Sequence, residues 1–224
     1  MNSQINIDLK NESDSKETAD VSVAQEINLG ILLELGSIGA GHAATALSDI
    51  IQQQILIDVP KIHKIPPHLI PNFYNRHDIP TIAIYLQLTS KFGCDILLTF
   101  ELTEAKKIAA MMTFANSIEE IDLEMETSAL HELANILIGS FLTAISDFIG
   151  ISLLPSTPQS IVDTFDAIID VFLIKQSMLA EDAMIFETRF KRQGEDAKCI
   201  LMIFPSQELK ELIAEKSKPI IELK

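Results

Sequence analysis

A carboxylate and a carboxamide stand on one face of a strongly apolar stretch, residues 128–147. Spacings of four and three residues align Ser128, Glu132 and Asn135 on one side of a helix. An exposed carboxylate can pair with a lysine of another protein, and a carboxamide can hold a water molecule through its separate donor and acceptor groups. The spacing therefore predicts a site that docks a partner and positions a water. The alternative is an ordinary solvated helix face.

The same polar line occurs a second time, 98 residues earlier in the chain. Aligning Glu34 with Glu132 gives nine identities in the 18 positions that begin with these two glutamates. The same offset places Pro60 opposite Pro158. An internal repeat of this extent predicts two related halves that share a core.

The rest of the chain must hold these two helices in place. Runs rich in β-branched residues predict two antiparallel hairpins, whose strand segments 96–100 and 200–204 match at an offset of 104. The predicted fold class is mixed α/β, of the α+β type, with a pseudo-twofold repeat and a β-sheet packed against two long motif helices. The other expected elements are helices at 23–54, 103–114, 160–176 and 207–215, strands at 55–59, 81–89, 95–100 and 151–156 and a hairpin within 183–204, and a loop at 61–80.

The repeat also suggests where the domain begins and ends. Residues 1–22 are polar without a hydrophobic period and predict a flexible N-terminal tail. A single domain is expected over residues 23–215, made of two repeats at about 23–116 and 117–215. Residues 216–224 are expected to form a C-terminal tail.

The overall charge and composition narrow the classes of function. With 32 acidic and 17 basic residues the net charge is -15, which disfavours nucleic-acid binding because that needs clustered Lys and Arg. Uncharged apolar runs such as 133–146 span only 14 residues, short of the roughly 20 that cross a bilayer, so no membrane insertion is expected. Cys94 and Cys199, with no secretory signal before them, predict free buried thiols in a reducing cytoplasm.

Two motifs that suggest other chemistry are incomplete. Residues 131–135 begin like the HExxH helix of zinc proteases, but Asn135 takes the place of the second histidine. Residues 36–41 resemble a nucleotide-binding loop only loosely, because the glycine spacing differs and no lysine follows. The remaining histidines form no ligand set, so no metal site is predicted, and no nucleophile is paired with a base.

The complete pattern resembles the motif of the CheC family of chemotaxis phosphatases. That motif is Asp or Ser, three residues, Glu, two residues, Asn, twenty-two residues and Pro, and it is often present twice. Ser128, Glu132, Asn135 and Pro158 match every position, and the resemblance extends from about residue 23 to residue 215.

The resemblance implies a hydrolase that removes the aspartyl phosphate from the response regulator CheY. Glu132 would pair with a lysine of the regulator, and Asn135 would position the attacking water. Mg²⁺ would belong to the regulator, and the protein would need no cofactor of its own. Such positioning suits phosphoryl transfer, which needs alignment and charge stabilisation more than covalent chemistry. The resemblance further suggests the deamidase CheD as a partner.

The first copy of the motif departs from the family pattern. It retains Glu34 and Pro60, but Gly30 replaces the leading Asp or Ser and Ser37 replaces Asn. A serine hydroxyl lacks the reach of a carboxamide, so a docking or degenerate site is predicted there. The alternative to a phosphatase is a non-catalytic adaptor that binds phosphorylated CheY or CheD, or a binding module like the flagellar switch proteins.

Overall fold

The computed structural model describes residues 11–221 apart from 77, 90–91, 116, 177–182 and 193–194. In this part of the chain, seven strands form one antiparallel sheet in the order β1, β6, β7, β4, β3, β5, and β2 also pairs with β6. The strands are β1 (Leu56–Ile57), β2 (Lys61–Ile65), β3 (Pro80–Gln87), β4 (Cys94–Glu101), β5 (Gln159–Thr164), β6 (Ala183–Arg192) and β7 (Glu195–Pro205). The helices are α1 (Asn11–Ile51), α2 (Ile70–Tyr74), α3 (Leu102–Thr113), α4 (Leu123–Ile149), α5 (Phe165–Gln176) and α6 (Gln207–Ile221), with short 3-10 turns at Pro67–Leu69 and Ile118–Glu120.

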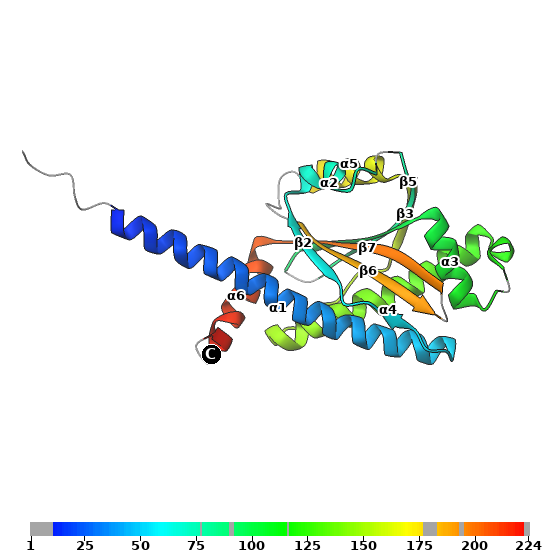
Figure 1. Ribbon diagram of the computed structural model, residues 1–224, viewed down its shortest axis with the longest axis horizontal. Helices are drawn as coiled ribbons and strands as arrows, with labels where there is room; N and C mark the ends of the chain where they lie inside the picture. The colour runs from blue at the N-terminus through cyan, green and yellow to red at the C-terminus, as the bar shows by residue number, and fades with distance from the viewer. Residues whose placement is uncertain are drawn as a thin grey trace, which may run out of the picture.

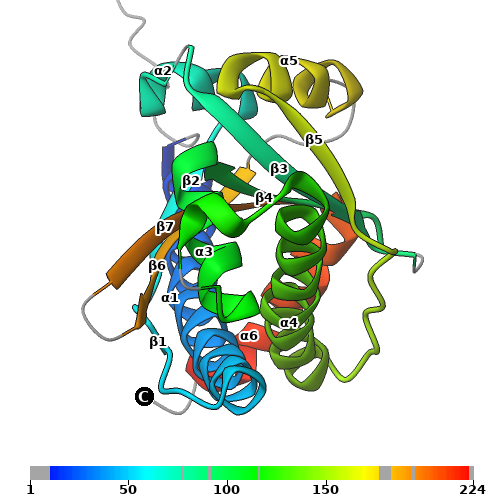
Figure 2. The same cartoon turned by 90° about the vertical axis from the view of Figure 1, so that its right-hand side faces the viewer.

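Helices cover both faces of the sheet. The long helices α1 and α4 lie side by side on one face together with α3 and α6, and the shorter α2 and α5 lie on the other (Figures 1 and 2). Each face has its own hydrophobic cluster of buried side chains. The predicted mixed fold, a sheet packed against two long motif helices, is confirmed.

The central strands are apolar on both sides because both of their faces are covered. Ile82, Ile84 and Leu86 of β3 join the core beneath α1 and α4, whereas Ala83 and Tyr85, which alternate with them, pack toward α5. This alternation follows from the period of two in a strand. It explains why the central strands are nearly continuous hydrophobic runs in the sequence.

Both ends of α4 are specified by single residues. Asp122 has extended backbone angles and its carboxylate accepts a hydrogen bond from the Met125 amide at 2.8 Å. Glu124 and Glu126 follow in the first turn, where negative charge is favourable. At the other end Gly150 has a φ of 73°, the left-handed conformation that stops a helix at little cost when the residue is glycine.

The backbones of α1 and α4 approach each other most closely at Gly39. A Cβ atom placed there would lie 2.8 Å from the Cα of Phe141, closer than real Cβ contacts. Gly41, on the same helix, would carry a Cβ atom with nothing within 4 Å. Gly39 is therefore required by the packing of the two helices, whereas Gly41 is not.

We expect Gly39→Ala to lower the free energy of unfolding by about 1–3 kcal/mol, because the added methyl group forces the two helices apart. Gly41→Ala is the matched control and should raise stability by about 0.5–1 kcal/mol through its higher helix propensity. Urea unfolding of both variants measures the difference. Equal stability of the two would contradict the role assigned to Gly39.

Two hydrogen bonds between a serine hydroxyl and a backbone amide are related by the predicted offset of 98 residues. After α1 the Ser48 hydroxyl oxygen accepts a hydrogen bond from the Ile55 amide at 2.9 Å. After α4 the Ser146 hydroxyl oxygen accepts one from the Leu153 amide at 3.0 Å. These equivalent serines hold the turn that follows each long helix, an arrangement consistent with the predicted repeat.

The pairing of the two central strands is consistent with the other offset, 104 residues. In β4 and β7, Ile96 pairs with Ile203 and Thr99 pairs with Ile200. Adding 104 to the residue number takes Ile96 to Ile200 and Thr99 to Ile203. The repeat therefore relates the pair of Ile96 with Ile203 to the pair of Ile200 with Thr99. A twofold relation of the halves would therefore place its axis between β4 and β7.

The two halves of the chain exchange strands at the edges of the sheet. β3 and β4 come from the first half, and the edge strand beside them is β5 from the second half. β6 and β7 come from the second half, and the strands beside them are β1 and β2 from the first. Each half of the sheet is thus completed by the other half of the chain.

Near both ends of the chain, the structure has helix in residues that were predicted to be tails. Helix α1 begins at Asn11, inside the stretch 1–22 predicted to be flexible, while residues 1–10 lie outside the described residues. This first part of α1 extends beyond the sheet (Figure 1), so it needs no apolar stripe to be helical. The predicted C-terminal tail from residue 216 is wrong as far as Ile221, because α6 continues there and buries Ser217, whose hydroxyl donates to the Ile213 carbonyl at 2.6 Å.

Local sequence patterns also gave wrong predictions of secondary structure in segments that form strands by pairing with distant parts of the chain. The predicted loop at 61–80 contains β2 and α2, because β2 pairs with five residues of β6. The strand predicted at 151–156 lies instead at β5, in residues where the sequence favoured a helix. Hydrogen bonding to the backbone of β3 outweighs local propensity at β5.

The prediction of free buried thiols is confirmed, whereas the short uncharged runs do not by themselves exclude membrane spans. Cys94 and Cys199 are free and buried, and burial raises the pKa of each thiol. Gly30–Ile51 of α1 and α4 are long and apolar enough to cross a bilayer by length and composition alone. Their apolar faces lie in the core that they share with the sheet, which accounts for their composition.

Candidate functional site

The structure places the polar line of α4 on the surface. Ser128, Glu132 and Asn135 are all exposed, whereas Leu130 and Leu133 are at most 1% exposed and face the sheet. The helical period predicted this division. We call Ser128, Glu132 and Asn135 the motif site.

The side chains of Glu132 and Asn135 in the motif site are available to a partner. No hydrogen bond or ion pair joins the side chain of Glu132 or Asn135 to another residue that the structure describes. The two residues lie three positions apart, so both project from adjacent turns of one rigid helix. A carboxylate and a carboxamide held in this way can contact two different groups of a second protein at once.

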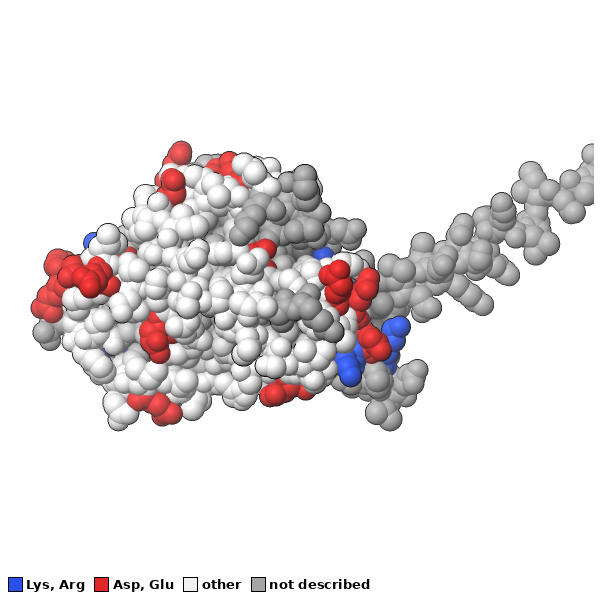
Figure 3. All heavy atoms as spheres, turned by 180° about the vertical axis from the view of Figure 1, so that it is seen from behind, with Lys and Arg blue, Asp and Glu red and all other residues white. Residues whose placement is uncertain are grey.

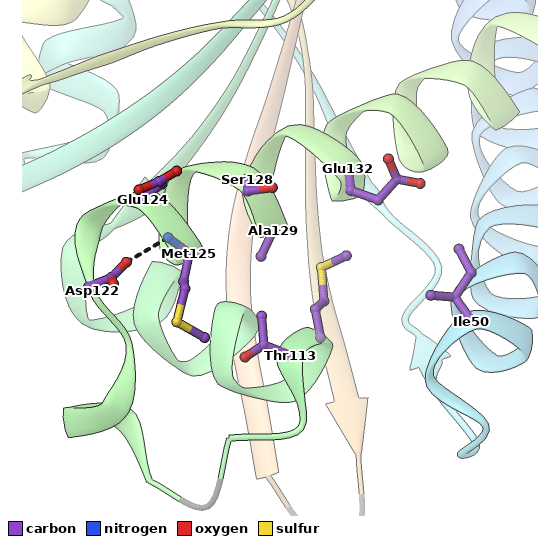
Figure 4. Close-up of a pocket in the computed structure, with 9 residues that line it drawn as sticks. Ile50, Thr113, Asp122, Glu124, Met125, Ser128, Ala129 and Glu132 are labelled. Atoms are coloured by element: carbon purple, nitrogen blue, oxygen red, sulfur yellow. Dashed lines mark hydrogen bonds between the residues drawn. The ribbon is translucent and has the colours of Figure 1, made fainter.

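A hollow of about 420 Å³ opens beside the motif site (Figure 4). It lies between the first turns of α4, the last turn of α3 and the end of α1, which contribute Ser128 and Glu132, Met112 and Thr113, and Ile50 respectively. The remaining lining residues are Asp122, Glu124, Met125 and Ala129 of the α4 N-terminal region. We call this feature the acidic hollow.

Carboxylates stand at both ends of the acidic hollow. Figure 4 shows Asp122 and Glu124 at one end and Glu132 at the other, with Met125 and Thr113 between them. Seen from the back of the molecule, acidic side chains gather at the end where α3 meets α4 (Figure 3). Asp122 itself caps the start of α4 through its hydrogen bond from the Met125 amide.

The first copy of the motif presents a different surface. Glu34 is exposed like Glu132, but Ser37 is only half exposed and its hydroxyl donates a hydrogen bond to the Leu33 carbonyl at 2.7 Å. The serine is thereby tied to its own helix, unlike Asn135. We call Glu34 and Ser37 the first-copy site.

The two motif prolines differ in their surroundings. Pro60 is buried and would lie 3.4 Å from a Cβ atom at Gly36, so it packs against α1 near the first-copy site. Pro158 is half-buried and immediately precedes β5. A role for Pro60 and Pro158 in supporting the two motif sites stays a prediction.

Sequence reasoning missed the contribution of α3. Met112 and Thr113 come from the end of a helix whose spacing predicted only packing, and nothing in their local pattern indicates a surface hollow.

The four histidines that the structure describes do not gather into one cluster, and His77 lies outside the described residues. His63 is 3.5 Å from a carboxylate oxygen of Glu187, and His42 and His68 are exposed at separate places. His131 is half-buried on α4, and its Nε2 has no hydrogen-bond partner among the described residues. Within the described part of the chain, no group of three or more His, Cys, Asp or Glu residues could hold a metal ion.

Comparison with known proteins shows that this chain is similar to proteins of the CheC type. Residues 29–63 and 125–162 match the CheC-like family, and these two segments contain both motif glutamates and both motif prolines. The CheY-P phosphatase CheC of Bacillus subtilis is 29% identical over 82% of this chain and 90% of its own length. The resemblance to the CheC family predicted from the motif is therefore confirmed.

Two further similarities come from a flagellar protein. The flagellar motor switch phosphatase FliY of Bacillus subtilis is 31% identical over 59% of this chain and 35% of its own length. The crystal structure of Thermotoga maritima FliY has the same fold, with a TM-score of 0.68 over 86% of this chain and 96% of that one at 22% identity.

Proposed function

We propose that this protein is a phosphatase that hydrolyses the aspartyl phosphate of a CheY-type response regulator, with one catalytic site on α4. The observation that supports the proposal most directly is the exposure of Glu132 and Asn135 on one rigid helix, without partners among the described residues. The named activity of the CheC relative supplies the substrate class. We propose that the protein acts in the cytoplasm, where response regulators are phosphorylated.

The proposed mechanism is positioning across a protein interface. Glu132 pairs with a lysine of the regulator and fixes the register of docking. Asn135, one turn further along α4, then reaches the phosphorylated aspartate, where its amide group orients the attacking water through hydrogen bonds. The regulator's own Mg²⁺ stabilises the charge on the transferring phosphoryl group, so the phosphatase contributes no metal ligand.

The first-copy site is proposed to dock a regulator without efficient catalysis. Glu34 offers an exposed carboxylate at the same place on its helix as Glu132. Ser37 is shorter than asparagine, and its hydroxyl proton is already donated to the Leu33 carbonyl. The first-copy site therefore retains the docking group and lacks the group that would hold water.

The direct test is a phosphate-release assay. A CheY-type regulator is phosphorylated with acetyl phosphate, freed of excess donor, and mixed with the purified protein in Mg²⁺ buffer. We expect the protein to accelerate loss of the phosphoryl group over the regulator alone, and chelation of Mg²⁺ to abolish the acceleration. Absence of acceleration in Mg²⁺ would overturn the phosphatase assignment.

A second candidate function is a binding module of the flagellar switch or an adaptor for phosphorylated CheY or CheD. The similarity to FliY favours this alternative, because FliY of Bacillus subtilis is named as a flagellar motor switch phosphatase. An adaptor would retain the phosphorylated regulator without shortening its lifetime. Measuring binding and phosphate loss on the same samples separates the two functions, and a pull-down with purified CheD tests that partner.

A further inference from the structure

We propose that the acidic hollow receives a second basic side chain, a lysine or arginine of the docked regulator, and so helps to select which regulator is dephosphorylated. The inference rests on the proposed function, because it assumes that α4 docks a regulator. It goes beyond that function by assigning a specificity pocket separate from the contact of Glu132.

The lining of the acidic hollow fits a long cationic side chain. Met112, Met125, Ala129 and Ile50 provide apolar surface, and the carboxylates of Asp122 and Glu124 stand at the far end. None of the nine lining residues is Lys or Arg. Lysine and arginine bury an aliphatic stem along such apolar surface while the charged end reaches polar groups, and methionine adapts to irregular shapes.

The carboxylates are the charged groups in the acidic hollow that can bind a cation. The Thr113 hydroxyl donates to the Ala109 carbonyl at 2.8 Å within its own helix. One Asp122 oxygen accepts from the Met125 amide at 2.8 Å, and each carboxylate oxygen can accept more than one hydrogen bond. Glu124 is exposed and therefore free to orient toward an entering cation.

Distances along α4 show that this contact differs from the one assigned to Glu132. Glu124 and Glu132 are eight residues apart, about 12 Å along a helix that rises about 1.5 Å per residue. An ion pair needs its nitrogen and oxygen within about 4 Å, so the single ammonium group of one lysine is not expected to pair with both carboxylates. Two basic residues of the partner are needed to engage both ends of the acidic hollow.

The acidic hollow also adjoins the motif site closely enough to be covered by the same partner. Glu132 belongs to both, and Glu124 lies about 16 Å along the helix axis from Asn135. A standard protein interface buries about 800 Å² on each partner, a patch roughly 30 Å across. A regulator whose phosphorylated aspartate lies over Asn135 can therefore also cover the acidic hollow.

The test reverses the charge at the far end without touching the motif site. Binding of a CheY-type regulator activated with beryllofluoride and Mg²⁺ is measured for Glu124→Lys, and dephosphorylation is measured on the acetyl-phosphate-labelled regulator. We expect Kd and KM to rise about tenfold, because a like charge now faces the partner's cation, while kcat stays within about twofold. The matched control, Glu119→Lys, makes the same charge change on an exposed neighbour that does not line the acidic hollow, and should leave Kd within about twofold.

A second pair of variants tests the apolar wall. Met125→Ala should weaken binding about threefold by removing a surface that packs on the basic side chain's stem. Leu123→Ala removes a comparable apolar side chain that is 69% exposed and does not line the acidic hollow, and should have no effect.

The outcomes separate this inference from the proposed function. If the wild-type protein binds and dephosphorylates the regulator but Glu124→Lys behaves like Glu119→Lys, the specificity pocket is wrong and the phosphatase assignment stands. If the wild-type protein neither binds nor dephosphorylates the regulator, both are overturned. If it binds without dephosphorylating and the Glu124 effect on Kd persists, the pocket stands and the catalytic assignment falls.

Discussion

Asn135→Ala should reduce dephosphorylation of the regulator by about 100-fold, the cost expected when one positioned polar group is removed from a phosphoryl-transfer site. The fold should be intact, because Asn135 is exposed and alanine is the better helix former. Phosphate release under single-turnover conditions measures the loss. A thermal melting curve, expected at or slightly above the wild-type temperature, measures stability.

The control for this variant is Thr143→Ala. Thr143 is exposed on the same helix, two turns beyond Asn135, and its hydroxyl contacts only the Gly139 carbonyl of α4 among the described residues. We expect its turnover to equal that of the wild type. Unchanged turnover in Asn135→Ala, together with an unchanged melting curve, would rule out a water-positioning role.

The two copies of the motif should contribute unequally to turnover. Removing Glu132 and Asn135 together should abolish acceleration above the regulator's own rate, because both docking and water positioning are lost. Removing Glu34 and Ser37 together should leave at least about half of the activity, because Ser37 is tied to Leu33 and holds water poorly. Each double alanine variant is assayed on the same phosphorylated regulator.

A gain of function provides the complementary measurement. Ser37→Asn should raise turnover above wild type, and should restore measurable turnover in the Glu132→Ala, Asn135→Ala background, because it supplies the missing amide beside Glu34. Equal losses in the two double variants would show that the sites are equivalent and that the asymmetry is wrong.

The sequence predicted the motif site well because a helix converts spacing into direction. In a helix, positions 128, 132 and 135 share one face. The other residues of this helix are mostly apolar and pack against the sheet, so the polar face points outward, as the structure confirms. The hairpins that form β3, β4, β6 and β7 were equally predictable from their β-branched runs. The Ser37 hydroxyl bond to Leu33 could not be predicted, because a serine in a helix can also point to solvent.

The remaining errors have a common physical origin in contacts between distant segments. β2 and β5 are short, polar at several positions, and become strands because β6 and β3 offer them backbone partners. The acidic hollow arises where α3, α4 and α1 end near one another, and no single segment carries its pattern. The helical start at Asn11 was missed because the prediction relied on an apolar period, which a helix projecting from the sheet does not require.

The exchange of edge strands between the two halves has a consequence for the order of folding during synthesis. β2 emerges from the ribosome more than a hundred residues before β6, its partner in the sheet. Nor can β3 complete its outer pairing until β5 has been made, and the central pair of strands forms only when β7 appears. Such long-range pairings slow folding, since a large loop must close before each contact forms. The first half of this chain must therefore wait, with its apolar strands unpaired at one edge, until nearly the whole protein has been translated.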